Sequence, residues 1–132
     1  MLKKPYITIV SPVYKAEKIV DELVKRIETE IVKITLDYEI ILVEDCSPDK
    51  SWSKILENCR RNNKIKGVKL SRNFGQHYAI SAGVLKSKGE NIVLMDCDLQ
   101  DNPKDIKKLI DKREEGFDIV FTKRIQRKHS FI

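Results

Sequence analysis

The sequence lacks the marks of a disulfide-rich, zinc-binding or membrane-spanning protein. Its three cysteines, Cys46, Cys59 and Cys97, have no C-x-x-C spacing, and one of them stays unpaired under any pairing. Such usage indicates a reducing compartment and argues against a disulfide framework or a zinc site. No window approaches the roughly 18 consecutive apolar residues of a transmembrane helix, and no apolar segment near Met1 suggests a signal peptide. We therefore expect a cytoplasmic location, or the cytoplasmic face of a membrane if the full-length chain carries C-terminal hydrophobic helices.

Two phosphate-binding motifs are also missing. No G-x-G-x-x-G follows the first predicted strand, and no G-x-x-x-x-G-K-[ST] occurs anywhere. Their absence excludes a P-loop NTPase and argues against a dinucleotide site of the Rossmann type. A ligand that carries phosphate groups would have to be held by a metal ion and by arginine or lysine side chains.

The charge balance is basic, and the length suits a single domain. Lysine and arginine number 26 against 20 acidic residues, a net charge of +6. That excess is compatible with nucleic acid, anionic lipid headgroups or a phosphorylated substrate. Because aromatic residues do not alternate with the basic ones, we expect no nucleic-acid partner. The 132 residues are expected to form one domain, residues 1–132, and association of identical chains is left open.

Segments with strand-like composition alternate with segments of helical periodicity along the chain. The predicted strands are 6–10, 39–43, 67–71, 91–95 and 118–122. After the first strand, apolar residues such as Ile19, Leu23 and Ile27 recur at three- and four-residue steps, as in an amphipathic helix. The alternation predicts an α/β fold, a mostly parallel sheet with helices on both faces.

The stretch from Asn91 to Asp101 carries the clearest chemical signal. Its apolar half predicts a strand covered on both faces, and Asp96, Asp98, Gln100 and Asp101 follow. Carboxylates this close repel one another unless a cation lies between them. Hard oxygen ligands in this number suit Mg²⁺ or Mn²⁺. The competing interpretation, an acidic loop that caps the next helix, explains one of the acids and leaves the others without a role.

Polar residues follow the other predicted strands as well. Ser11-Pro12-Val13-Tyr14 comes after the first strand, Glu44-Asp45 after the second and Ser71-Arg72-Asn73 after the third. In parallel α/β sheets, ligands bind outside the carboxyl ends of the strands, near the reversal of strand order. We therefore expect these residues and the aspartates to converge on one site.

Four motifs, in this order along the chain, resemble those of family 2 glycosyltransferases with the GT-A (Rossmann-like) fold. They are V-S-P-V-Y at 10–14, V-E-D-C-S at 43–47, L-S-R-N-F-G at 70–75 and M-D-C-D-L-Q-D at 95–101. The last two are similar to the branch that includes dolichol-phosphate mannosyltransferase and bacterial polyprenyl-phosphate glycosyltransferases. Lys15 departs from the pattern, because the family commonly has asparagine after the tyrosine.

The resemblance implies a set of site residues. It places the nucleotide-sugar against Pro12, Tyr14, Glu17, Asp45, Arg72, Gly75, Asp96 and Arg124. It implies a Mg²⁺ or Mn²⁺ ion held by Asp96, Asp98 and Gln100, and catalytic roles for Asp98 and Asp101. For Tyr14, packing on the first helix is the competing interpretation, and for Arg72 a surface position.

The implied activity is metal-dependent transfer of a sugar, with inversion, from a UDP- or GDP-linked donor to a polyprenyl or dolichyl phosphate. Such a role belongs to the synthesis of cell-envelope glycans. The family continues past this point into acceptor-binding and membrane-associated segments, so the chain is expected to be the donor-binding part of a longer enzyme at a membrane surface. Two alternatives stay open. One is a saccharide hydroxyl as acceptor, and the other is a non-catalytic or regulatory α/β domain with a metal-binding aspartate cluster.

Overall fold

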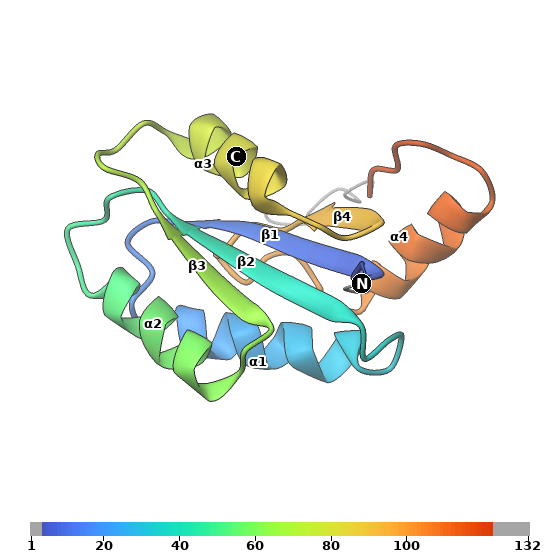
Figure 1. Cartoon of the computed structure of the whole chain (residues 1–132), viewed down its shortest axis with the longest axis horizontal. Helices are drawn as coiled ribbons and strands as arrows, with labels where there is room; N and C mark the ends of the chain where they lie inside the picture. The colour runs from blue at the N-terminus through green and yellow to red at the C-terminus, as the bar shows by residue number, and fades with distance from the viewer. Residues whose placement is uncertain (1–3, 123–132) are drawn as a thin grey trace, which may run out of the picture.

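A computed structural model, which describes residues 4–122, contains four strands and four helices in strict alternation (Figure 1). The strands are β1 (Ile7–Val13), β2 (Tyr38–Glu44), β3 (Ile65–Lys69) and β4 (Asn91–Leu94). The helices are α1 (Val20–Ile31), α2 (Ser51–Arg61), α3 (Gln76–Lys86) and α4 (Asp105–Glu114). The alternation predicted from the sequence is confirmed in these eight elements.

All four strands are parallel and lie in the order β3-β2-β1-β4. Ile9 pairs with Ile40 on one side of β1 and with Val93 on the other. The chain lays down β1, β2 and β3 in succession, and then returns across the sheet to place β4 on the far side of β1. The strand order therefore reverses between β1 and β4, and this is where parallel α/β sheets form their ligand crevices.

The helices cover the two faces of the sheet, as the sequence predicts (Figure 1). One apolar cluster joins alternate residues of β1, β2 and β4, such as Ile9 and Leu42, to residues of α1, α2 and α4. A smaller cluster on the other face packs Val10 and Ile41 beneath Ala79 of α3. The buried residues of α1 are Val20, Leu23, Val24, Ile27 and Ile31. Their spacing is that of one helix face, which explains why this segment folds as a helix against the sheet.

Small residues let α3 lie close to the sheet. A Cβ atom on Gly83 would come within 2.4 Å of Val10 Cγ1, so only glycine allows this approach. Gly89, which has the sequence position expected of a helix C-terminal glycine, instead lies against β1. A Cβ there would be 2.5 Å from Thr8 Oγ1 and 2.6 Å from the Thr8 nitrogen.

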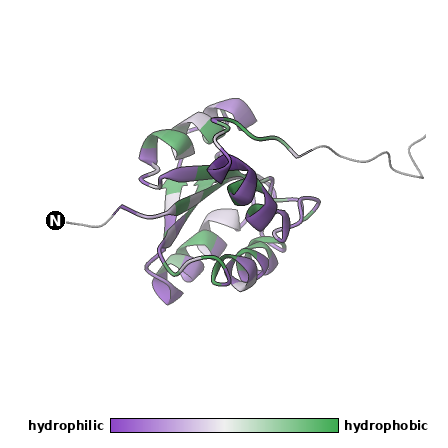
Figure 2. Ribbon diagram, turned by 90° about the vertical axis from the view of Figure 1, so that its right-hand side faces the viewer, coloured by the Kyte–Doolittle hydropathy of each residue, from purple (hydrophilic) through white to green (hydrophobic). Residues whose placement is uncertain are grey.

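Two expectations about strands are wrong, one about the faces of β4 and one about a strand at 118–122. Among the described strands β4 lies at the edge of the sheet, and it is not covered on both faces, because α3 packs over β1 and β2 and leaves Ile92 and Leu94 about half exposed. The predicted strand at 118–122 is also not formed in the part of the chain that the structure describes. Ile119 and Phe121 alternate as in a strand, but a strand needs a neighbour for its backbone groups, and this segment pairs with none of the described strands. In Figure 2 it is the green ribbon that leads to the grey trace.

β1 continues past the Ser11-Pro12 pair, where the sequence suggested an end. Pro12 pairs in register with Val43 of β2, whereas β4 ends at Leu94, opposite Val10. Proline lacks a donor N–H, and here it stands beyond the end of one neighbouring strand, where the missing hydrogen bond costs little. This extension carries the end of β1 beyond the end of β4.

None of the helices in residues 4–122 has the length and apolar character needed to cross a lipid bilayer.

Candidate functional site

A cavity of about 450 Å³ opens at the carboxyl edge of the sheet. Its walls come from the ends of β1, β2 and β4 and from the start of α3. The lining residues are Pro12, Val13, Tyr14, Asp45, Asn73, Gly75, Gln76, Asp96, Cys97 and Asp98. We call it the strand-end cavity. Because it lies where the strand order reverses, its place in the fold is the one expected for a ligand site.

The loops at the carboxyl edge of the sheet contain residues with strained backbone. Among the described residues, Lys15, Cys46 and Leu99 are the non-glycine residues with positive φ, at 50°, 52° and 65°. Each lies in the loop that follows a strand, after β1, β2 and β4 respectively. Residues other than glycine adopt such angles at a cost of roughly 1–3 kcal/mol, and such residues cluster at functional sites. The strain therefore marks the carboxyl edge independently of the side chains.

At the end of β2 two adjacent acids hold neighbouring loops. The buried Glu44 carboxylate accepts hydrogen bonds from the N–H groups of Cys46 at 3.1 Å and Ser47 at 2.8 Å, and Lys69 Nζ lies 3.2 Å away. Asp45 accepts the N–H groups of Phe74 at 2.9 Å and Gly75 at 3.0 Å. Asp45 thus lines the cavity and also anchors the loop before α3. Its predicted contact with a nucleotide base stays a prediction.

The aspartates after β4 are organised by hydrogen bonds within their own loop. The Asp96 N–H donates to Asp101 Oδ2 at 2.9 Å, and the Gln100 N–H donates to Asp98 Oδ1 at 3.0 Å. Across the cavity, Gln76 Nε2 donates to Asp96 Oδ1 at 2.9 Å. The structure therefore brings Asp96 and Asp98 to the wall of one cavity and gives Asp101 a contact with the backbone of that wall.

The donor set fits a divalent cation only in part. Asp96 and Asp98 supply two carboxylates to the strand-end cavity. Within residues 4–122 no group of three or more histidine, cysteine, aspartate or glutamate side chains is arranged to hold a metal alone. Mg²⁺ usually takes one or two carboxylates, keeps several waters and completes its shell with substrate phosphates. Two carboxylates beside an open cavity match that habit.

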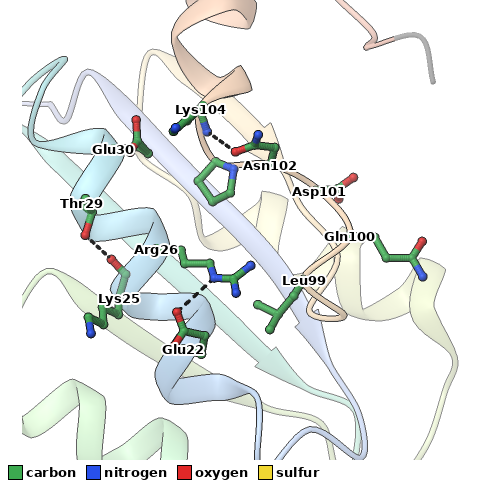
Figure 3. A pocket seen from close by; sticks show the side chains of 11 residues that line it. Glu22, Lys25, Arg26, Thr29, Glu30, Leu99, Gln100, Asp101, Asn102 and Lys104 are labelled. Atoms are coloured by element: carbon green, nitrogen blue, oxygen red, sulfur yellow. Dashed lines mark hydrogen bonds and ion pairs between the residues drawn. The ribbon is translucent and has the colours of Figure 1, made fainter. Parts of the chain in front are cut away.

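A second cavity, of about 510 Å³, lies on the other side of the acidic loop, against α1 (Figure 3). Its lining residues are Glu22, Lys25, Arg26, Thr29, Glu30, Leu99, Gln100, Asp101, Asn102, Pro103 and Lys104. Gln100 and Asp101 line this cavity and not the strand-end cavity, although both are hydrogen-bonded to the aspartates that line the latter. Their predicted roles as metal ligand and catalytic residue stay predictions.

Of the remaining predicted site residues, some line the strand-end cavity and others lie elsewhere. Pro12, Tyr14 and Gly75 line the strand-end cavity. Tyr14 is 42% exposed, which does not fit burial beneath the first helix. Arg72 lies outside the lining and stacks its guanidinium 4.8 Å from the centre of the Phe74 ring. Arg124 lies outside the described residues.

Glu17 takes part through its backbone in a junction between two loops. Its N–H donates to Asp49 Oδ2 at 3.2 Å, while the Ser47 and Ser51 hydroxyls donate to Asp49 Oδ1 at 2.6 and 2.7 Å. Burial alone would raise the pKa of Asp49, but these hydrogen bonds outweigh it and lower the pKa to about 2. The ionised Asp49 therefore fastens the loop after β1 to the loop after β2.

Four cavity residues were not predicted as ligands: Val13, Asn73, Gln76 and Cys97. Asn73 has the sequence character of a turn residue, and its Nδ2 does donate to the Asp45 carbonyl at 3.1 Å. Burial raises the pKa of the Cys97 thiol, and the neighbouring Asp98 and Asp96 carboxylates raise it further, so the thiol is uncharged at neutral pH. A residue that directly follows the glycine before a helix is well placed to face a strand-end ligand, and this was the available signal for Gln76.

Comparison with known proteins supplies an independent line of evidence. Residues 8–131 match the family model described as glycosyl transferase family 2. A protein of Synechocystis sp. described as an uncharacterized glycosyltransferase is 40% identical over 121 residues, which cover 92% of this chain. The chain spans 38% of that relative's length.

Solved structures share the fold. The Staphylococcus aureus TarS 1-349 structure in complex with UDP is 25% identical, with a TM-score of 0.63 over 83% of this chain and 32% of that one. The mannosyltransferase PcManGT from Pyrobaculum calidifontis, in complex with GDP-Man and Mn²⁺, is 19% identical. Its TM-score is 0.65 over 73% of this chain and 28% of that one, and at this identity the likeness shows the fold alone.

Proposed function

The chain belongs to glycosyl transferase family 2, and we propose on that basis that its strand-end cavity binds the nucleotide-sugar donor of a sugar transfer. The observation that carries the proposal is the placement of Asp96 and Asp98 beside Tyr14 and Asp45 in one cavity, at the reversal of strand order. A nucleotide-sugar requires an apolar ring contact for the base and a site for two phosphates, and the cavity offers residues for both.

We assign the phosphate end of the donor to the β4 side of the cavity. Asp96 and Asp98 would hold Mg²⁺ or Mn²⁺, which when bound neutralises the diphosphate as it leaves. Tyr14, exposed on the β1 side, would lie against the base and ribose. Membership of the family supports a nucleotide-linked donor, and the TarS structure in complex with UDP, which is 25% identical, makes UDP the first of the two nucleotides to test beside GDP.

For the acceptor we propose a polyprenyl or dolichyl phosphate, attacked with inversion at the sugar carbon, at the cytoplasmic surface of a membrane. The proposal rests on the S-R-N-F-G and M-D-C-D-L-Q-D motifs. A hydroxyl acceptor needs a general base within hydrogen-bond reach, whereas a lipid phosphate is already an anionic nucleophile. Asp101 is the candidate base, but its carboxylate accepts the Asp96 N–H and lines the cavity on the α1 side. This position favours an acceptor that needs no base, the lipid phosphate.

Calorimetric titration tests the donor site. UDP and GDP, each with and without Mn²⁺, are titrated into the chain, and one of the two nucleotides is expected to bind more tightly with the metal present. If neither nucleotide binds, the cavity is not a donor site.

The acceptor is tested separately by supplying radiolabelled nucleotide-sugar together with polyprenyl phosphate in detergent, or with soluble saccharides, to the longest natural form of the protein. Label in the saccharides and not in the lipid would refute the lipid acceptor.

A further inference from the structure

Gln76 is the first residue of α3, and its side chain reaches across the strand-end cavity to the loop after β4. Its Nε2 donates to Asp96 Oδ1 at 2.9 Å, joining residues that come from different β/α units. We propose that Gln76 is a positioning residue that orients the Asp96 carboxylate for a divalent cation. The inference rests on the proposed metal and donor site, and it assigns Gln76 a role through Asp96 and not a direct contact with the donor.

The backbone that carries Gln76 is held at a fixed position. Phe74 and Gly75 directly precede Gln76, and Asp45 accepts the N–H groups of both. Gly75 has φ of 102°, an angle that a residue with a Cβ rarely adopts, and this turns the chain into α3. Beyond Gln76, Ala79 is fully buried against the sheet. The amide of Gln76 is therefore presented from a rigid support on both sides.

Asp96 is held from two directions. Its main-chain N–H donates to Asp101 Oδ2, within the loop after β4, and its side chain accepts from Gln76, on the helix across the cavity. A carboxylate that keeps one rotamer before the cation arrives loses less conformational freedom on binding it. Residues that orient metal ligands in this way change metal affinity by about 10–100-fold when they are replaced.

The chemical type of the residue suits this task. An amide N–H donates a hydrogen bond without adding charge and without titrating near neutral pH. A lysine or arginine at the same place would also fix Asp96, but its positive charge would repel the incoming cation. Glutamine leaves the negative charge of Asp96 available to the metal.

The test is the affinity of the chain for Mn²⁺ in the presence of saturating UDP or GDP, whichever binds, measured by electron paramagnetic resonance of free Mn²⁺. Gln76→Met keeps the length of the side chain and its helix propensity but removes the donor. We expect Mn²⁺ to bind about tenfold more weakly, with the affinity for the nucleotide in EDTA unchanged. The control, His77→Met, introduces the same side chain one residue further along α3, at an exposed position outside the cavity lining. It should leave the Mn²⁺ affinity as it is in the natural chain.

Each outcome decides something. Equal Mn²⁺ affinity for the natural chain and Gln76→Met, with binding lost in Asp96→Asn, would overturn the role of Gln76 and leave the metal site intact. Weaker nucleotide binding by Gln76→Met in EDTA would show that Gln76 touches the donor directly, which also overturns a role through Asp96. Failure of the natural chain to bind Mn²⁺ with either nucleotide would overturn the proposed metal site, and the positioning role with it.

Discussion

Glu39, at the amino end of the sheet, and the Asp96–Asp98 pair, at its carboxyl end, are carboxylates in opposite environments. At the amino end, Glu39 of β2 is 1% exposed, and all its contacts are internal. Thr8 Oγ1 and the Lys88 N–H donate to its Oε2 at 2.7 and 2.6 Å, and Lys66 Nζ lies 2.8 Å from its Oε1. At the carboxyl end, Asp96 and Asp98 face an open cavity. The first group is enclosed by the protein's own donors, and the second pair lines an open cavity.

The difference assigns Glu39 to the stability of the fold, and it fits the proposed role of Asp96 and Asp98 in binding. A buried carboxylate must be satisfied by internal donors, since leaving it unpaired costs several kcal/mol. Burial alone would raise the pKa of Glu39, but the hydrogen bonds from Lys66, Thr8 and the Lys88 N–H outweigh it, and its pKa lies below the usual value. The amino-end network holds three strands and the α3–β4 loop together, as the buried Glu44 does for the loop after β2, whereas the loop after β4 leaves Asp96 and Asp98 in the lining of an open cavity. Four experiments test this contrast.

The largest effect is expected from Glu39→Ala. The substitution leaves the buried Thr8 hydroxyl and the Lys88 N–H without their acceptor, so the free energy of unfolding should fall by roughly 3 kcal/mol. Urea denaturation measures it, and nucleotide affinity below the transition should not change. Glu90→Ala, an exposed acid near the same edge, is the control and should cost less than about 0.5 kcal/mol. Equal stability for both variants would remove the distinction between the two ends.

Asp98→Asn should weaken ligand binding and leave the stability of the ligand-free chain unchanged, the converse of Glu39→Ala. The variant is expected to lose the metal-dependent rise in melting temperature caused by nucleotide, a stabilisation of about 2.7 kcal/mol at a hundredfold excess over Kd. Without ligand it should be as stable as the natural chain or slightly more so, because one of two repelling charges is gone. EDTA should abolish the same rise in the natural chain, and Asp111→Asn, at an exposed position on α4, should leave it intact. A loss of about 1 kcal/mol without ligand, with binding retained, would instead show that Asp98 serves to hold its own loop, through the hydrogen bond from the Gln100 N–H.

Asp49 provides a test by pH at the carboxyl end. Its folded pKa of about 2 lies below the ordinary value of 3.8, so the stability it contributes is complete above about pH 4 and is lost as the pH falls toward 2. Asp49→Asn should lower the free energy of unfolding at pH 7 by on the order of 1 kcal/mol. The difference from the natural chain should shrink as the pH falls through this window. A difference that stays constant from pH 7 to 2 would show that ionisation of Asp49 plays no part.

Lys15 offers the smallest effect, with the opposite sign. Its φ of 50° disfavours most side chains, and asparagine tolerates this region better than lysine does. Lys15→Asn should therefore stabilise the fold by about 0.5 kcal/mol, measured by the melting temperature. The same replacement at Lys18, an exposed lysine without positive φ, controls for the loss of charge. Destabilisation by Lys15→Asn would mean that the lysine stabilises the loop by some other contact, such as its position 5.5 Å from the Tyr14 ring centre.

Much of the fold could be predicted because the signals are local. Apolar periodicity identified α1, and short apolar runs identified β2 and β4, since both patterns follow from the geometry of a single element. Asp96 and Asp98 could be assigned to the sheet edge because they directly follow β4 in the chain. The same locality explains the failure at 118–122, where the alternation of Ile119 and Phe121 is right for a strand but says nothing of a pairing partner.

The order of the described elements and the kind of chemistry carried by the strand-end loops can be read from the amino-acid sequence alone. The tertiary structure alone decided which of those loops meet. The return of β4 to the side of β1 put Asp96 opposite the start of α3, so that an amide 20 residues away could bind it. It also put Gln100 and Asp101 in the lining of the cavity against α1 and left Asp98 in the strand-end cavity. Such choices depend on pairing and packing between segments distant in the chain, and no short stretch of residues encodes them.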